Sequence, residues 1–294
     1  MRPIHKKTKM HICAFSASSL WALGYVLTRV AVEDFTSDTL AFLRYLIAAI
    51  TLIIVAIIKK MRLPERKDIP TFFLGGAIGF AVYVLFMNEG SRTLTAAVVS
   101  FIISATPVVT AFLARFILKE KIGVKGWISI SCAFLGISTI TYFNGGFVFS
   151  SGIIWVCIAM LLVSFYNIFL RKLFTRYNPL EITTYCIIAG AILLIPFSFR
   201  SYPQLTEASA AGILSIIILG VFSASLAYLF WAYALNNAEK TSEATNYMFL
   251  TPILTSIMGI IMIKETPHYS VYIGGALVLT GVILINYRKG VNVK

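Results

Sequence analysis

Two carboxylates, Glu89 and Glu243, are the ionisable side chains whose positions most favour chemistry. Glu89 follows Asn88 at the end of a long apolar segment, and Glu243 lies near the start of another, close to Thr245, Asn246 and Tyr247. Ionising a carboxyl group beside so much apolar sequence is costly unless it has a partner. Either carboxylate could therefore bind a substrate ammonium group or carry a coupling proton. The alternative for each is an ordinary solvated side chain at the boundary of its segment.

Aromatic residues supply the second kind of chemistry. The chain has 22 Phe, 14 Tyr and 4 Trp. Trp21 and Tyr25 are four residues apart, so they share one face of a helix, and aromatic faces bind cations and flat molecules. The candidate binding residues are deep aromatics, nearby amides and one carboxylate: Trp21, Tyr25, Tyr83, Asn88, Glu89, Tyr166, Asn167, Tyr228, Trp231, Asn246 and Tyr247. Ordinary helix packing is the alternative explanation for many of the aromatics.

The elements that carry these residues must be helices in lipid. Of 294 residues, 59% are hydrophobic and 13% are charged, and the mean hydropathy is +0.86. A soluble protein of 32.5 kDa has too small an interior for this composition. The sequence therefore excludes a soluble enzyme, a disordered chain and a secreted disulfide scaffold. Continuous apolar runs of about 20 residues predict an all-α integral membrane protein with ten spans, at 11–32, 39–58, 71–89, 94–118, 124–143, 151–170, 179–199, 208–236, 241–263 and 269–287.

The net charge of +13 is explained by insertion into the membrane. With ten spans, 19 of the 25 lysines and arginines fall on the side of the two termini. The opposite side holds only Arg29, Arg92, Arg200 and Lys264. Basic residues stay on the cytoplasmic side, so we expect a multi-pass plasma-membrane protein with both termini in the cytoplasm. The positive charge is no sign of a nucleic-acid partner.

Other chemistries find little support. The four cysteines lie inside the spans without a CxxC pair, and the three histidines lie at segment ends or in loops, so no metal site is expected. No phosphate-binding glycine loop occurs, and no cofactor is expected. The expected partners are a small-molecule substrate and membrane lipids. Glycines allow close helix contact within one chain or between two copies, so monomer and homodimer both stay open: Gly126, Gly136, Gly274, Gly275 and Gly281.

A repeat divides the chain into two halves, 1–147 and 148–294. A shift of 145 residues pairs Pro107 with Pro252, Glu120 with Glu265 and Gly136 with Gly281. Each half holds five predicted helices, an odd number, so the second half must enter the membrane from the opposite side. Inverted repeats of this kind are typical of secondary transporters. Proline kinks a helix, so Pro107 and Pro252 are predicted to be paired hinges, with static kinks as the alternative.

Several short motifs resemble a known family. They are W-A-L-G at 21–24, F-L-R-Y at 42–45, S-F-Y-N-x-x-x-R-K at 164–172, and the threonine, proline and K-E positions that recur after the shift of 145. They resemble EamA-type transporters of the drug/metabolite transporter superfamily, with each half as one EamA repeat. The resemblance implies a cavity lined by the first, third, fourth, sixth, eighth and ninth helices. It also implies a structural Arg44, which we expect to reach the outer headgroups and the acidic Glu33, Asp34 and Asp38. Thr251 departs from the family, which often has Glu before this proline.

These patterns together predict a secondary transporter, not an enzyme. It would move small metabolites such as amino acids or organic cations, in the outward direction, by alternating access around a central aromatic-lined cavity. The alternative is an integral-membrane enzyme or a carrier acting on a lipid-linked or nucleotide sugar. An enzyme would need clustered acid–base or metal residues, and a nucleotide-sugar carrier would need basic residues in its cavity.

Overall fold

The computed structural model describes residues 4–119, 122–145, 151–169, 173, 175–238 and 241–286, and the regular elements within these ranges are all helical. Eight helical segments in them are long and apolar enough to cross a membrane. Two further helices contain shorter apolar stretches, Val124–Ile140 and Tyr269–Leu284. An architecture of long apolar helices is that of an integral membrane protein, as the sequence predicts.

The α-helices are named here in chain order. They are α1 (Ile4–Asp34), α2 (Ser37–Ile58), α3 (Ile69–Gly76), α4 (Val82–Ser91), α5 (Ala96–Ser104), α6 (Thr106–Ile117), α7 (Val124–Gly145), α8 (Ser151–Phe169), α9 (Pro179–Leu194), α10 (Ser201–Glu207), α11 (Ala210–Ile218), α12 (Ala227–Asn237), α13 (Thr241–Thr245), α14 (Leu250–Ile263) and α15 (Tyr269–Asn286). Short 3-10 turns are η1 (Arg66–Asp68), η4 (Ile195–Arg200) and η6 (Asn246–Phe249), and two π-helical turns are η2 (Ala77–Ala81) and η5 (Leu219–Leu226).

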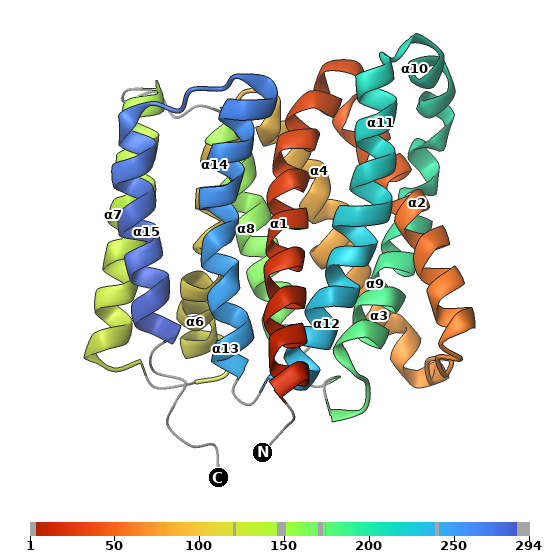
Figure 1. Cartoon of the computed structure of the whole chain (residues 1–294), viewed down its shortest axis with the longest axis horizontal. Helices are drawn as coiled ribbons and strands as arrows, with labels where there is room; N and C mark the ends of the chain where they lie inside the picture. The colour runs from red at the N-terminus through yellow and green to blue at the C-terminus, as the bar shows by residue number, and fades with distance from the viewer. Residues whose placement is uncertain are drawn as a thin grey trace.

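The helices stand side by side as one bundle (Figure 1). We call the end where α1 stops at Asp34 the upper end, and the end where α1 starts at Ile4 the lower end. The helix α1 runs through the middle of the bundle, α7 and α15 form a pair at one side, and α2, α3 and α9 lie at the other. The described part of α15 also stops at the lower end.

Local sequence explains where several helices begin. The side chain of Thr95 accepts a hydrogen bond from the amide of Val98 and so caps α5. Ser209 caps α11 in the same way through Gly212. At α9, Asn178 and Glu181 form a reciprocal capping box, with a proline in the first turn. Such caps satisfy amide groups that have no partner inside the helix.

Several of the membrane-crossing segments are interrupted near their middles. The segment that begins at α3 passes through η2 before continuing as α4, and the segment that begins at α11 passes through η5 before α12. The α5–α6 segment breaks at Ala105, directly before Thr106 and Pro107. Likewise, Pro252 lies in the first turn of α14, after η6. The interruptions at both prolines are the geometry that proline produces, whereas their role as hinges stays a prediction.

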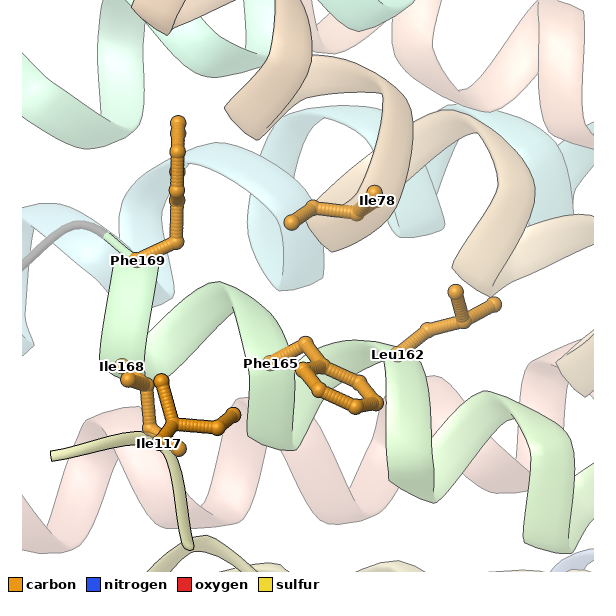
Figure 2. A pocket seen from close by; sticks show the side chains of 6 residues that line it. All are labelled: Ile78, Ile117, Leu162, Phe165, Ile168 and Phe169. Atoms are coloured by element: carbon orange, nitrogen blue, oxygen red, sulfur yellow. The ribbon is translucent and has the colours of Figure 1, made fainter. Parts of the chain in front are cut away.

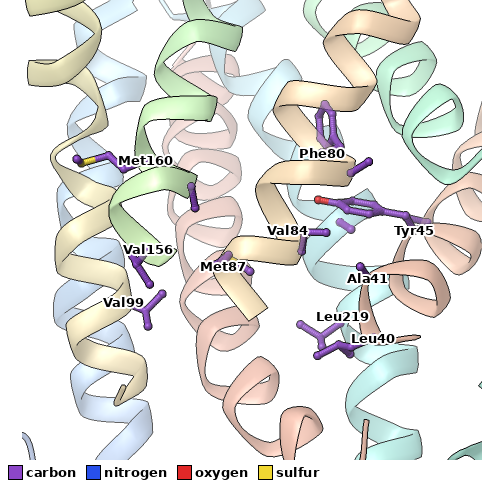
Figure 3. Close-up of a cluster of buried hydrophobic side chains, with 14 of the residues drawn as sticks. Leu40, Ala41, Tyr45, Phe80, Val84, Met87, Val99, Val156, Met160 and Leu219 are labelled. Carbon is purple, nitrogen blue, oxygen red and sulfur yellow. The ribbon is translucent and has the colours of Figure 1, made fainter. Parts of the chain in front are cut away.

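Glycine permits the close approach of α7 and α15. A Cβ atom on Gly136 would lie 2.5 Å from the carbonyl oxygen of Gly274, and one on Gly281 would lie 2.6 Å from that of Ser129. These glycines therefore bring two helices of the same chain together. Elsewhere the core is filled by side chains from α2, η2, α4, α5, α8 and η5 (Figure 3), including Leu40, Tyr45, Phe80, Val84, Val99, Val156 and Leu219.

Candidate functional site

Six aromatic side chains meet inside the bundle, and we call them the aromatic group: Trp21, Tyr45, Phe80, Tyr166, Tyr228 and Trp231. The ring of Trp21 lies 5.4 Å from that of Tyr228 and 5.3 Å from that of Trp231, between centroids. Edge-to-face and tilted contacts at these distances are favourable. The group joins α1, α2, η2, α8 and α12.

Phe80 links the two sides of the aromatic group. Its ring is 5.7 Å from Tyr45 and 5.4 Å from Tyr166, both in nearly perpendicular contacts, and 6.2 Å from Tyr228, with an angle of 61° between the two rings. Figure 3 shows Tyr45 reaching from α2 toward Phe80 and Val84. Tyr45 and Phe80 were not among the predicted site residues. Their signals were available, since Tyr45 belongs to the F-L-R-Y motif and Phe80 lies three residues before Tyr83 on one helical face.

The π-helical turns place these rings. Phe80 lies within η2, and Tyr228 follows η5 by two residues. A π-turn inserts one extra residue into a helix and is common at functional sites. Within η2, Gly79 faces the ring of Tyr166, and a Cβ atom there would lie 2.2 Å from the ring. Gly79 therefore makes room for the ring of Tyr166 against the segment that carries Phe80.

Two further predicted tyrosines, Tyr25 and Tyr83, lie beside the aromatic group. Their side chains interact with one another, and the hydroxyl group of Tyr83 donates to the sulfur of Met87 at 3.2 Å. The hydroxyl groups of both tyrosines and of Tyr228 lie close enough to Arg44 to interact electrostatically with its positive charge. The structure thus brings together six of the predicted binding residues: Trp21, Tyr25, Tyr83, Tyr166, Tyr228 and Trp231.

The expected position of the Arg44 side chain, near the outer headgroups and acidic residues, is wrong. The side chain does not reach the outer headgroups, because it is buried, with 9% of its surface exposed, and contacts the hydroxyl group of Thr28 on α1. The acidic groups expected to attract it have other partners. Asp34 accepts from Ser209, Asp38 pairs with Arg200, and Glu33 pairs with Arg29.

The remaining predicted residues lie away from the aromatic group. At the upper end, Asn88 is buried and donates to the backbone oxygen of Ser37, and exposed Glu89 accepts from the Ser37 hydroxyl at 2.5 Å. Asn167 is exposed on α8. Near the lower end, Glu243 lies on α13, Asn246 is exposed, and the hydroxyl group of Tyr247 is 3.1 Å from Nδ1 of His11.

Two hollows flank the bundle without touching the predicted residues. The first, of about 330 Å³, has an entirely apolar lining (Figure 2): Ile78, Ile117, Leu162, Phe165, Ile168 and Phe169. The second, of about 320 Å³, lies at the lower ends of α1, α2 and α12 and includes Lys9 and Lys59. Within the described ranges, no cluster of His, Cys, Asp and Glu could hold a metal ion.

A family comparison accounts for this architecture. The profile of the EamA-like transporter family matches residues 8–142 and again residues 150–287. The chain belongs to the EamA-like transporter family. The family match and the apolar helices together make it a multi-pass membrane protein of a transporter family, as the motifs predicted.

Individual relatives of this EamA-like chain carry transporter names. It is 32% identical to the uncharacterized transporter YdfC of Bacillus subtilis, over 95% of this chain and 92% of that protein. It is 30% identical to an uncharacterized transporter of Archaeoglobus fulgidus, over 92% and 96% of the two chains. It is 28% identical to a probable terminal-alkyne amino-acid exporter of Streptantibioticus cattleyicolor, over 91% and 90%.

A solved structure shares the fold of this EamA-like chain. It is described simply as the crystal structure of a protein, and the TM-score is 0.65. The match covers 97% of this chain and 99% of the other, at 16% sequence identity. At that identity, the likeness concerns the arrangement of the helices alone.

Proposed function

We propose that this EamA-like protein is a secondary transporter that exports small metabolites, such as amino acids or organic cations, by alternating access around the aromatic group. The observation that carries the proposal is that the aromatic group draws on both halves of the chain. Trp21, Tyr45 and Phe80 come from residues 1–147, and Tyr166, Tyr228 and Trp231 come from residues 148–294. A site between repeats is what alternating access requires.

The repeat extends to the site residues. The shift of 145 residues that pairs Pro107 with Pro252 also pairs Trp21 with Tyr166 and Tyr83 with Tyr228. The backbone repeats as well, because Lys119 and Lys264, which the same shift pairs, both have a left-handed φ of 55°. These correspondences support two inverted five-helix repeats and ten spans.

The contact between α7 and α15 supports the same symmetry. The shift of 145 residues pairs Gly136 with Gly281 and Ser129 with Gly274. The close approach of Gly136 to Gly274 therefore becomes that of Gly281 to Ser129, and both approaches are present. A pair of contacts exchanged by the repeat is expected of two halves related by a twofold axis.

Charge supports the orientation. Lys9 near the start of α1, Lys59 and Lys60 after α2, and Lys125 at the start of α7 belong to helix ends on the lower side of the bundle (Figure 1). Arg29 near the end of α1, Arg92 after α4, Arg200 at the end of η4, and Lys264 after α14 belong to the upper side. We assign the lower end, and with it both termini, to the cytoplasm, and the protein to the plasma membrane. Aromatic faces suit the ammonium group of an amino acid as well as an organic cation. One relative is named a probable terminal-alkyne amino-acid exporter, which supports export and amino acids as the cargo.

Counterflow in proteoliposomes tests the proposal. A thermal-shift screen of L-amino acids, amines and organic cations would select ligands, and vesicles loaded with a hit should then accumulate the labelled compound. W21A should lose most of this exchange, because Trp21 contacts both Tyr228 and Trp231. Y202A, which changes an exposed tyrosine on α10, is the matched control. If no screened compound exchanges, or if W21A behaves like Y202A, the proposal is wrong.

A further inference from the structure

Arg44 carries a charge for which the described protein supplies no counter-charge. Its side chain extends from α2 and is buried in the bundle, and no described Asp or Glu forms an ion pair with it. Within the described ranges, its side chain makes one hydrogen bond, from Nη1 to Oγ1 of Thr28, and at 3.5 Å this bond is long. Nε is fully enclosed and has no acceptor. A guanidinium has five N–H donors, so most of its bonding capacity is unused.

A charge in this position is expensive. Burying an ion that is not paired costs far more than burying a neutral polar group, and intramembrane arginines usually face a partner or a cavity. Among the described residues, Arg44 is the single lysine or arginine whose side chain is buried. We infer that Arg44 is the residue that binds the carboxylate of the transported substrate, so that the substrate supplies the missing counter-charge. This inference rests on the proposed transport function and narrows its substrate class.

The surroundings of Arg44 suit such a ligand. The guanidinium carbon lies 5.8 Å from the ring centroid of Tyr45, and its charge acts on Tyr25, Tyr83 and Tyr228. The hydroxyl group of Thr28 donates its proton to the carbonyl oxygen of Gly24, one turn earlier in α1, at 2.7 Å, so its oxygen faces Arg44 as an acceptor. A carboxylate on Arg44 would therefore lie beside the aromatic group, where the rest of an amino acid could contact aromatic rings.

The backbone of α2 is held firmly enough to position Arg44. A Cβ atom on Gly220 would lie 3.0 Å from the backbone oxygen of Arg44, so glycine brings η5 against α2 at this residue. The hydroxyl group of Ser225, also in η5, donates to the backbone oxygen of Ala48 at 3.3 Å. The π-helical turn that leads to Tyr228 thus packs against the backbone of α2 at Arg44.

The charge count distinguishes two anionic ligands. A single guanidinium matches one carboxylate in a bidentate pair. A nucleoside-diphosphate sugar has two phosphates, and the buried side chains that the structure describes include no second lysine or arginine to pair with them. We therefore assign a carboxylate and treat a phosphate as an outcome of the test.

The experiment compares L-amino acids with their C-terminal amides, which keep the ammonium group and side chain but lose the negative charge. In counterflow, the wild type should prefer the acid over the amide by about ten- to a hundredfold, the range expected for a charged hydrogen bond. R44Q should lose this preference while still exchanging the amide, and that exchange shows that the variant is folded. R115Q changes an exposed arginine at the lower end of α6 and should keep the wild-type preference.

The outcomes separate this inference from the transport proposal. Equal wild-type exchange of acid and amide overturns the carboxylate assignment, and so does an R44Q variant that still prefers the acid. If the wild type exchanges organic cations alone, the transport proposal stands and the role of Arg44 is wrong; if it exchanges nothing, transport itself fails. Competition by uridine monophosphate but not by amino acids would identify a phosphate ligand and overturn the assignment. Should R44Q not fold, the wild-type ratio and the charge-preserving R44K decide, and R44K must retain a preference for the acid.

Discussion

Nε of Arg29 on α1 donates a hydrogen bond of 3.0 Å to Oε1 of Glu265, which follows α14 at the upper end of the bundle. The second carboxylate oxygen of Glu265 accepts from the amide of Ala96, at 3.0 Å, where α5 begins. One carboxylate therefore ties α1 and α5 of the first half to the second half. Under the proposed alternating-access mechanism, this connection has to separate when the upper end opens.

Crosslinking tests whether it separates. In a background without native cysteines, joining R29C to E265C with a short thiol crosslinker should stop transport, and reduction should restore it. R29C with E33C is the matched control, because these residues form an i,i+4 pair within α1 and cannot tie the halves together. Wild-type counterflow by the crosslinked R29C/E265C protein would mean that the upper end does not open during transport.

Gly79 is predicted to tolerate no side chain. In G79A the new Cβ atom would overlap the ring of Tyr166, and forced repacking of this kind costs about 1–3 kcal/mol. We expect a lower melting temperature in detergent and slower counterflow, because the Tyr166 ring must move away from Phe80. G259A is the control, since a Cβ atom at Gly259 has no neighbour within 4 Å. Equal melting temperatures for the two variants would contradict the packing argument.

The helical spans could be read from the sequence because each is a continuous apolar run. The prediction for 39–58 differs from α2 by two residues at its start, and 179–199 stops one residue short of the end of η4. Breaks inside the spans were predictable where the sequence has a proline: at Pro107 and Pro252, which were predicted, and at Pro196, just after the end of α9, which was not. The π-helical turns η2 and η5 depend on how helices pack, and no residue type in them signals the extra residue.

The candidate site was predictable only in part, because its residues come from several helices whose relative rotation the sequence does not give. Deep aromatic residues could be picked out one at a time, but which of them meet depends on rotation of each helix about its axis. Asn167, next to Tyr166 in sequence, is exposed for this reason. The surroundings of Arg44 could not be inferred either, because the acidic residues near it in sequence are bonded to Arg29, Arg200 and Ser209.

Asp68 is predicted to anchor the lower end. Its Oδ2 atom accepts from Arg176 at 2.8 Å and from the hydroxyl group of Tyr177 at 2.9 Å, so it joins the start of α3 to the loop before α9. D68N removes the negative charge of the carboxylate to which both side chains donate. We expect this to lower the unfolding free energy by about 1–3 kcal/mol. Detergent-denaturant titration measures it. E65Q, which breaks an exposed pair with Lys67, should change little.

The same contact predicts a pH dependence. Burial raises the pKa of the Tyr177 phenol above its ordinary value of about 10, and its hydrogen bond to Asp68 raises it further. The phenol of the unfolded chain ionises first, so stability is fully present below about pH 10 and falls as pH rises toward the pKa of the folded protein. In Y177F this fall should be smaller. An identical alkaline loss in Y177F would exclude Tyr177 as its source.

Pro107 and Pro252 are predicted to control turnover more than binding. In P107A an amide at residue 107 would allow α5 and α6 to continue as one helix, although the carbonyl oxygen of Ile103 already accepts from Thr106. We expect P107A and P252A to lower the maximal exchange rate several-fold with little change in the half-saturating concentration. P203A, on exposed α10, serves as the control. A change in affinity alone would favour static kinks.

Glu89 and Glu243 offer different expectations for proton coupling. Glu89 is exposed and accepts from Ser37 at the upper end of α4, whereas Tyr83 lies at the other end of this helix, so E89Q should leave pH-driven accumulation unchanged. Glu243 is half-buried on α13, in the segment that continues into Pro252. If protons drive export, E243Q should abolish accumulation driven by a pH gradient while preserving counterflow, which needs no gradient. Accumulation at the wild-type level in E243Q would exclude coupling through this carboxylate, and its loss in E89Q would move the coupling site to the upper end.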